Sequence, residues 1–179
     1  MSTAGREGPG TAPTTPEAVS DSGTAHFVDA GASALLSRMQ AVVEGLRAGT
    51  AADRTTLRID LPEAGCSVAT CAAESCAAGV RSIRRDASLP QRDLETVRWI
   101  EQHRTLLVQP DFSVPPHPPQ ALLEVYGVGA QMLAPIVRDG VMVAWLSVHS
   151  MAERPWSEAD RAAVTAAAER IGDLLSYSE

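Results

Sequence analysis

The chain has 179 residues, of which 45% are hydrophobic and 21% are charged, and these values are ordinary for one soluble globular domain. Its net charge of −7 argues against a nucleic-acid-binding protein, because neutralising phosphates needs a basic surface. No segment approaches the ~18 apolar residues of a membrane span, and residues 1–20 lack the apolar core of a signal peptide. We therefore expect a cytoplasmic protein without membrane partners.

The first part of the chain changes character near residue 22. Residues 1–22 consist mainly of Ser, Thr, Pro, Gly and Ala, and we expect a disordered tail there, followed by a folded domain over residues 23–179. From residue 24 to 47, apolar side chains recur near helical spacing, which predicts an amphipathic helix that ends at Gly49. Its apolar stripe must pack on a sheet or on the same helix of a second subunit.

A hairpin is predicted next. Residues 54–60 alternate polar and apolar side chains, which is typical of a strand with one buried face. A turn over residues 61–65 leads to residues 67–75, which we expect to form the returning strand. A helix is then predicted from Leu89 to about His103, and a short buried strand over residues 105–109 follows it.

The clearest local signal lies at residues 131–148. Two apolar runs are joined there by Asp139-Gly140, a pair that suits a tight hairpin turn because both residues tolerate positive φ. The second run, residues 141–148, is almost wholly apolar, so it belongs in the middle of a sheet.

The last predicted helix begins at a capping box formed by Ser157 and Asp160. Upstream of the hairpin, residues 111–119 form a proline-rich loop and residues 120–126 a short helix. Strands that come in hairpins predict an α+β fold with a mostly antiparallel sheet of five or six strands and helices on its faces.

The order of elements in residues 105–175 resembles the second half of a GAF domain. The strand LLVQ, the hairpin MLAPIV-RDG-VMVAWLSVH and the Trp-Ser-x-x-Asp start of the last helix carry this resemblance, and residues 55–60 and 68–74 resemble the first half more loosely. The resemblance implies a small-molecule pocket between the sheet and a lid, here residues 111–128. It also implies a regulatory role beside an effector domain. Because this chain leaves no room for such a domain, we expect a stand-alone module, a homodimer through its terminal helices, that acts on a separate effector protein.

The family binds cyclic nucleotides, bilins, haem, aromatic acids and other metabolites, and one branch reduces free methionine sulfoxide. Cys66, Cys71 and Cys76 are spaced unlike a zinc signature, and they lie before the region where the reductase and bilin-binding branches place their cysteines. The cyclic-nucleotide signature needs Lys and Asn, which this chain lacks. No catalytic residue and no metal site is assigned, although a small enzyme with thiol or histidine chemistry stays an alternative.

His117 carries the other alternative, a haem-based gas or redox sensor. The stretch Pro115-Pro116-His117-Pro118-Pro119 is similar to the His-His-Pro-Pro stretch that carries the haem-ligating histidine in GAF domains of mycobacterial dormancy sensor kinases. The competing interpretation is a histidine exposed on a loop.

The favoured ligand is a small organic metabolite, with aromatic and anionic molecules both left open. The anion-binding candidates are Arg81, Arg84, Arg85 and Arg98, because a guanidinium binds a carboxylate through two hydrogen bonds, and the alternative for each is a solvated surface role. Trp99 and Trp145 are also compatible with a role in the core. The predicted ligand-binding residues are Arg81, Trp99, Gln109, Asp111, His117, Tyr126, Gln131, Trp145 and His149.

Overall fold

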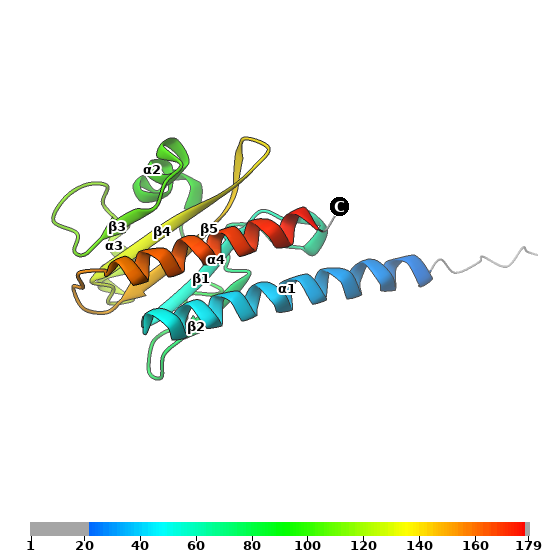
Figure 1. Cartoon of the computed structure of the whole chain (residues 1–179), viewed down its shortest axis with the longest axis horizontal. Helices are drawn as coiled ribbons and strands as arrows, with labels where there is room; N and C mark the ends of the chain where they lie inside the picture. The colour runs from blue at the N-terminus through cyan, green and yellow to red at the C-terminus, as the bar shows by residue number, and fades with distance from the viewer. Residues whose placement is uncertain (1–21, 178–179) are drawn as a thin grey trace, which may run out of the picture.

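The computed structural model describes residues 22–177, so the predicted tail lies outside the described part except for Ser22. Within residues 22–177, five strands form one antiparallel sheet in the order β2-β1-β5-β4-β3 (Figure 1). The strands are β1 Arg54–Ile59, β2 Ala73–Cys76, β3 Leu107–Gln109, β4 Ala130–Arg138 and β5 Val141–Ser150. The helices are α1 Ser22–Thr50, α2 Glu95–His103, α3 Gln120–Glu124 and α4 Glu158–Ser176, with short 3-10 turns at Pro62–Ala64 and Gln91–Asp93. The α+β prediction is confirmed.

The hairpin of β4 and β5 forms as predicted. Asp139 and Gly140 have φ values of 50° and 77°, so both turn residues take the left-handed conformation that this turn requires. The apolar strand β5 lies at the centre of the sheet, between β1 and β4. Its position follows from its composition, because a strand with almost no polar side chains must be covered on both faces.

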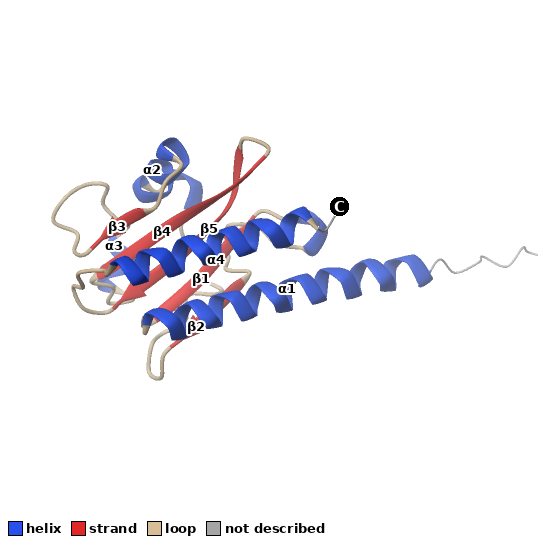
Figure 2. Ribbon diagram, in the orientation of Figure 1, coloured by secondary structure: helices blue, strands red, loops and turns tan. Residues whose placement is uncertain are grey.

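One face of the sheet is covered by the two long helices, which lie side by side (Figure 2). Helix α1 contributes Met39 and Val43 to this core and α4 contributes Ile171, all fully buried. Leu57 and Leu146 meet them from the sheet. Each buried aliphatic side chain stabilises the fold by roughly 1.5–3 kcal/mol, so this face holds most of the apolar stabilisation.

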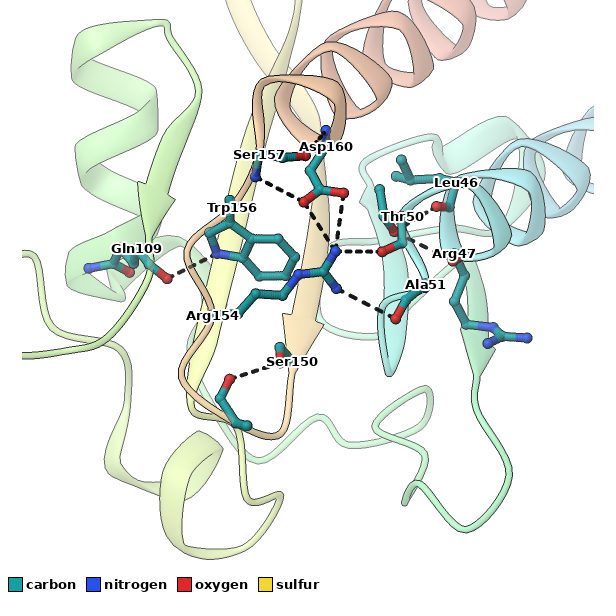
Figure 3. A network of polar contacts seen from close by, with 11 residues as sticks. Leu46, Arg47, Thr50, Ala51, Gln109, Ser150, Arg154, Trp156, Ser157 and Asp160 are labelled. Carbon is teal, nitrogen blue, oxygen red and sulfur yellow. Dashed lines mark hydrogen bonds and ion pairs between the residues drawn. The ribbon is translucent and has the colours of Figure 1, made fainter.

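Arg154 joins the ends of these two helices, as Figure 3 shows. Its Nη2 donates to the carbonyl of Thr50 at 2.6 Å, where α1 ends, and to both carboxylate oxygens of Asp160 at 3.1 Å, in the first turn of α4. Asp160 also closes the predicted capping box with Ser157, which is confirmed. The guanidinium lies 4.5 Å from the centre of the Trp156 ring, and the indole Nε1 donates to the carbonyl of Gln109 at 3.1 Å.

The opposite face is covered by shorter pieces: α2, α3 and the loops before them. Two expectations fail here. The predicted strand over residues 67–75 is limited to Ala73–Cys76, because the side chains of Arg58 and Asp60 take up the backbone groups of residues 68 and 69. The predicted helix from Leu89 begins only at Glu95, since Leu94 is extended with ψ of 139°.

The first helix continues one residue past Gly49, and Ala51 follows with φ of 51°. Among residues 22–177, no helix has both the length and the hydropathy required to cross a bilayer.

Candidate binding site

The second face of the sheet combines a smaller apolar cluster, in which Leu107, Leu133 and Trp145 pack on Val97 and Ile100 of α2, with a row of buried polar side chains. Strand β1 places Arg54, Thr56 and Arg58 on this face, with exposed fractions of 0%, 1% and 5%. Their cross-strand partners on β5 are His149, Ser147 and Trp145 in direct register. Polar groups buried in this way cost free energy unless each finds a partner.

The polar row continues across β4 and β3. Gln131 of β4 lies in register with His149 of β5 on one side and with Gln109 of β3 on the other. Its amide donates to Oε1 of Gln109 at 2.8 Å, and the amide of Gln109 donates to the carbonyl of Pro116 at 2.6 Å. The row therefore reaches from β1 to the proline-rich loop.

A cavity of about 60 Å³ lies between this face and its cover. Its floor is formed by sheet residues Thr56, Arg58, Gln131, Leu133, Trp145, Ser147 and His149. Its cover comes from two segments, residues 83–97 and residues 119–126. The cavity has less than half of the roughly 150 Å³ in which an apolar protein cavity takes up benzene, so it suits a molecule of a few heavy atoms in this conformation.

A tyrosine–aspartate contact connects the two cover segments. The hydroxyl of Tyr126 donates to the carboxylate of Asp86. Hydrogen bonds from Ser88 and from Tyr126 lower the pKa of Asp86 to about 2, so this carboxylate stays ionised at neutral pH. The guanidinium groups of Arg54 and Arg81 lie 5.6 and 5.3 Å from the centre of the Tyr126 ring, so both cations contact this ring.

His149 is held in one tautomer by Arg54. Nη1 of Arg54 lies 3.1 Å from Nδ1 of His149, and because an arginine can only donate, Nδ1 accepts and the ring proton sits on Nε2. Burial, followed by the charges of Arg54 and Arg58, holds the pKa of His149 well below its usual 6.5. The imidazole is therefore neutral at physiological pH and lines the cavity with an N–H donor.

Arg54 is itself anchored. Nη2 donates to the carbonyl of Arg81 at 2.9 Å, and Nε lies 3.8 Å from the carboxylate of Glu74. That carboxylate also accepts from the backbone of Ile83 at 2.8 Å. Arg54 thus ties the sheet to the first cover segment and orients His149.

The structure brings four of the predicted ligand-binding residues together at the cavity: Tyr126, Gln131, Trp145 and His149. Gln109 lies one hydrogen bond behind Gln131. Arg81 is exposed at the rim, with its guanidinium on Tyr126.

The other three predicted residues lie elsewhere. Trp99 stacks on His103 with ring centres 4.1 Å apart, and Asp111 accepts from the backbone of Ser113 at 2.8 Å. His117 is exposed on the proline-rich loop and does not line the cavity. Of the expected lid over residues 111–128, only the part from Pro119 to Tyr126 covers the cavity.

Sequence reasoning missed Arg58, Thr56 and Ser147 on the floor and residues 83–97 in the cover. The alternation in residues 54–60 is also compatible with a polar face exposed to water. The residues next to this strand do not indicate that segments distant in the sequence cover that face. A usable signal was the position of this strand beside an apolar central strand, because such a neighbour is itself covered on both faces.

The cysteines are all free thiols in the structure. Burial raises the pKa of Cys71 to about 11, and it raises the pKa of Cys66 and of Cys76 as well. Little thiolate is therefore present at neutral pH, and thiolate is the reactive form. Among residues 22–177, no group of His, Cys, Asp and Glu is arranged to hold a metal ion.

Solved structures with the same fold include three kinds of protein. The first is the GAF domain of the cyanobacteriochrome TePixJ from Thermosynechococcus elongatus, with a TM-score of 0.65, 19% identity, and coverage of 80% of this chain and 89% of that one. A free methionine-R-sulfoxide reductase of type II from Thermoplasma acidophilum matches with a TM-score of 0.61, 12% identity, and coverage of 82% and 96%. The chromophore-binding domain of a Stigmatella aurantiaca phytochrome matches with a TM-score of 0.59, 22% identity and 90% coverage of this chain, which spans only 63% of that one.

At these identities the matches show a shared fold and nothing about the ligand. No curated protein sequence matches the chain. The model of the GAF domain family matches residues 34–175, which is most of the chain and takes in all five strands and all but the last residue of α4. The chain therefore belongs to the GAF domain family.

Proposed function

We propose that this chain is a sensory GAF module that binds a small organic metabolite in the cavity between the polar sheet face and its two cover segments. The observation that carries this proposal is a cavity whose floor combines five buried polar side chains with the apolar side chains of Leu133 and Trp145. A fold that only needed stability would place apolar side chains there, as it does on the other face.

A route for the response leads from the cavity to the terminal helices. Gln131 lines the cavity and donates to Gln109, whose backbone carbonyl accepts from Trp156. Trp156 lies against Arg154, which connects the ends of α1 and α4 (Figure 3). A ligand that moves Gln131 would thus change the contacts that set these two helices against each other.

The module would deliver this change to a partner through the terminal helices. A second copy of the chain is the proposed partner, with a separate effector protein downstream. Helix α1 extends past the rest of the domain (Figure 1), and a groove between the helices is lined by Ala41, Val42 and Tyr177, among others. Tyr177 has 82% of its surface exposed. Sedimentation analysis of the wild type should give twice the chain mass of 18.9 kDa, and Ala41→Glu should give the monomer.

Ligand binding is tested by a thermal-shift screen of small aliphatic and aromatic metabolites, since a ligand that binds only the folded state raises the melting temperature. Ser147→Leu should abolish any shift, because the larger side chain fills the cavity. Thr165→Leu adds the same side chain on the exposed face of α4 and should keep the shift. The proposal would be refuted if no compound in the screen raised the melting temperature of Thr165→Leu more than that of Ser147→Leu.

Haem and thiol catalysis are not part of this proposal. His117 lies outside the cavity lining, and about 60 Å³ is far too small for a porphyrin. The cysteine thiols have raised pKa values, which makes them poor nucleophiles at neutral pH.

A further inference from the structure

We infer that the ligand is a small carboxylate whose carboxylate group binds the guanidinium of Arg58, an inference that rests on the function proposed above. Arg58 lies on the cavity floor, on the central part of the sheet, and is only 5% exposed. It was not among the arginines that the sequence suggested as anion ligands.

The guanidinium of Arg58 is only half used by the protein. Nη1 donates to the carbonyls of Val68 and Ala69 at 2.9 and 2.8 Å. Nε and Nη2 have no hydrogen-bond partner among residues 22–177, and no carboxylate in that range lies within 4.0 Å of them. In the described part of the chain, the one fully enclosed side-chain nitrogen without a partner is Nε of Arg54, so the free nitrogens of Arg58 keep accessible surface, and Arg58 lines the cavity.

A buried cation without a carboxylate is costly for the fold. Asp86 is the carboxylate of the cavity lining, and it is already engaged by Ser88 and Tyr126 at the junction of the cover segments. The charge of Asp86 acts on Arg58 at longer range, but no carboxylate among residues 22–177 is hydrogen-bonded to this guanidinium, so its free donors can take an anion from the cavity. A guanidinium offers two parallel N–H donors whose spacing matches the two oxygens of a carboxylate, which makes a carboxylate the best complement.

A further donor faces the same space. His149 lines the cavity, its Nδ1 is occupied by Arg54, and its proton is therefore on Nε2. No hydrogen-bond partner for Nε2 occurs among residues 22–177. Burial, followed by the charges of Arg54 and Arg58, keeps this imidazole neutral, and Arg54 also orients it, so Arg54 acts as a positioning residue for a second donor to the anion.

The rest of the cavity accepts a short apolar group. Val97, Leu133 and Trp145 line it beyond the polar row, and about 60 Å³ limits the molecule to a few heavy atoms. Short-chain carboxylates such as acetate, propionate and butyrate meet these requirements. Benzoate is too large unless the cover opens.

The test is a titration of the full chain with sodium propionate, with propionamide as a neutral molecule of the same shape and sodium chloride as the ionic-strength control. The readout is the indole N–H resonance of Trp145 in a proton–nitrogen correlation spectrum, assigned with Trp145→Phe. Trp99 and Trp156 lie outside the cavity lining and serve as internal references. We expect a saturable shift with propionate and affinity for propionamide at least about tenfold weaker, since hydrogen bonds between charged groups are the stronger ones.

Arg58→Gln should weaken propionate binding by about tenfold or more and leave propionamide binding unchanged. Arg58→Lys should bind propionate with an affinity between those of the wild type and Arg58→Gln. The matched control is Arg98→Gln, which removes the same charge from an exposed arginine of α2 that pairs with Asp93. The correlation spectrum itself reports whether each variant is folded.

Three results would overturn the inference: propionamide binding as tightly as propionate, propionate binding undiminished in Arg58→Gln, or no response of Trp145 to any of these carboxylates. The first and second would leave a functional cavity and therefore the proposed function intact. The third, combined with a thermal-shift screen that fails to separate Ser147→Leu from Thr165→Leu, would remove the proposed function as well.

Discussion

The two faces of the sheet are built from the same strands and differ in almost every other respect. The face under α1 and α4 is apolar, closed and covered by two long helices. The face under α2 and α3 carries buried arginine, histidine and glutamine side chains around a cavity, and its cover is made of short segments. Alternation along each strand allows one sequence to serve both purposes, since neighbouring residues point to opposite faces.

Under the proposed function, this division gives stability to one face and recognition to the other. Apolar burial stabilises a fold without needing precise partners, whereas a buried charge costs free energy unless it is paired. Natural proteins depart from the rules of stable packing mainly at functional sites. The polar face is such a departure, and it can be tested by changing each face in turn.

The largest effect is expected on the apolar face. Leu146→Ala should lower the free energy of unfolding by about 2–5 kcal/mol, because Leu146 is fully buried between the helices and the sheet. Chemical denaturation measures the change. Val141→Ala is the control on the same strand: Val141 is 57% exposed, and its loss should change stability by less than about 0.5 kcal/mol. Equal effects for both variants would contradict the assignment of the core.

A smaller effect is expected where the helical layer is joined to the sheet. Arg154→Ala should lower stability by about 1–2 kcal/mol, since it leaves the carboxylate of Asp160 and the carbonyl of Thr50 without their shared donor. Arg161→Ala removes an exposed arginine from α4 and should leave stability nearly unchanged. Ligand binding should change the hydrogen-exchange protection of α1 and α4, and this change between the ligand-free and ligand-bound protein should be smaller in Arg154→Ala than in the wild type. An equal change in both proteins would exclude the proposed route.

The pH dependence of stability gives a third comparison. The pKa of His149 is lowered well below 6.5 in the folded state, so the unfolded chain takes up a proton before the folded one does. Stability from this residue is complete above about pH 6.5 and is lost as the pH falls from there toward the lowered folded-state pKa, with a slope of at most about 1.4 kcal/mol per pH unit. Denaturation curves between about pH 7.5 and about pH 5.5 should show a shallower slope for His149→Gln than for the wild type. Parallel slopes would mean that the imidazole is not held neutral.

The smallest effect is expected for Arg58, the residue proposed to bind the carboxylate of the ligand. Arg58→Met should leave the free energy of unfolding within about 1 kcal/mol of the wild type, because losing two hydrogen bonds to Val68 and Ala69 is offset by removing a buried charge. The same denaturation experiment as for Leu146→Ala measures it. A loss as large as that of Leu146→Ala would show that Arg58 is a structural residue and would break the distinction between the faces.

Much of the fold follows from local patterns. Asp139-Gly140, the apolar run of β5 and the capping box at Ser157 each encode a backbone conformation within a few residues, and all three form as predicted. The family model and the sheet order agree with the resemblance found in residues 105–175.

The site follows from local patterns only in part. The alternation of residues 54–60 indicates which side chains share a face, but whether the polar face meets water or a cover depends on residues 83–97 and 119–126. Arg58 was therefore missed, while the more conspicuous His117 lies on the surface. The returning strand is shorter than predicted because Arg58 donates to the carbonyls of Val68 and Ala69 and the carboxylate of Asp60 accepts from the N–H of Val68, and these contacts override the strand propensity of residues 67–72.

Equilibrium dialysis tests the central claim, that the polar face holds a ligand, without requiring the ligand to be known. Wild type, Ser147→Leu and Thr165→Leu would each be dialysed against a small-molecule extract of bacterial cells, and mass spectrometry would compare the compounds on the two sides of the membrane. We predict that a small carboxylate accumulates with the wild type and with Thr165→Leu and is absent from Ser147→Leu. Identical compositions for all three proteins would contradict the claim.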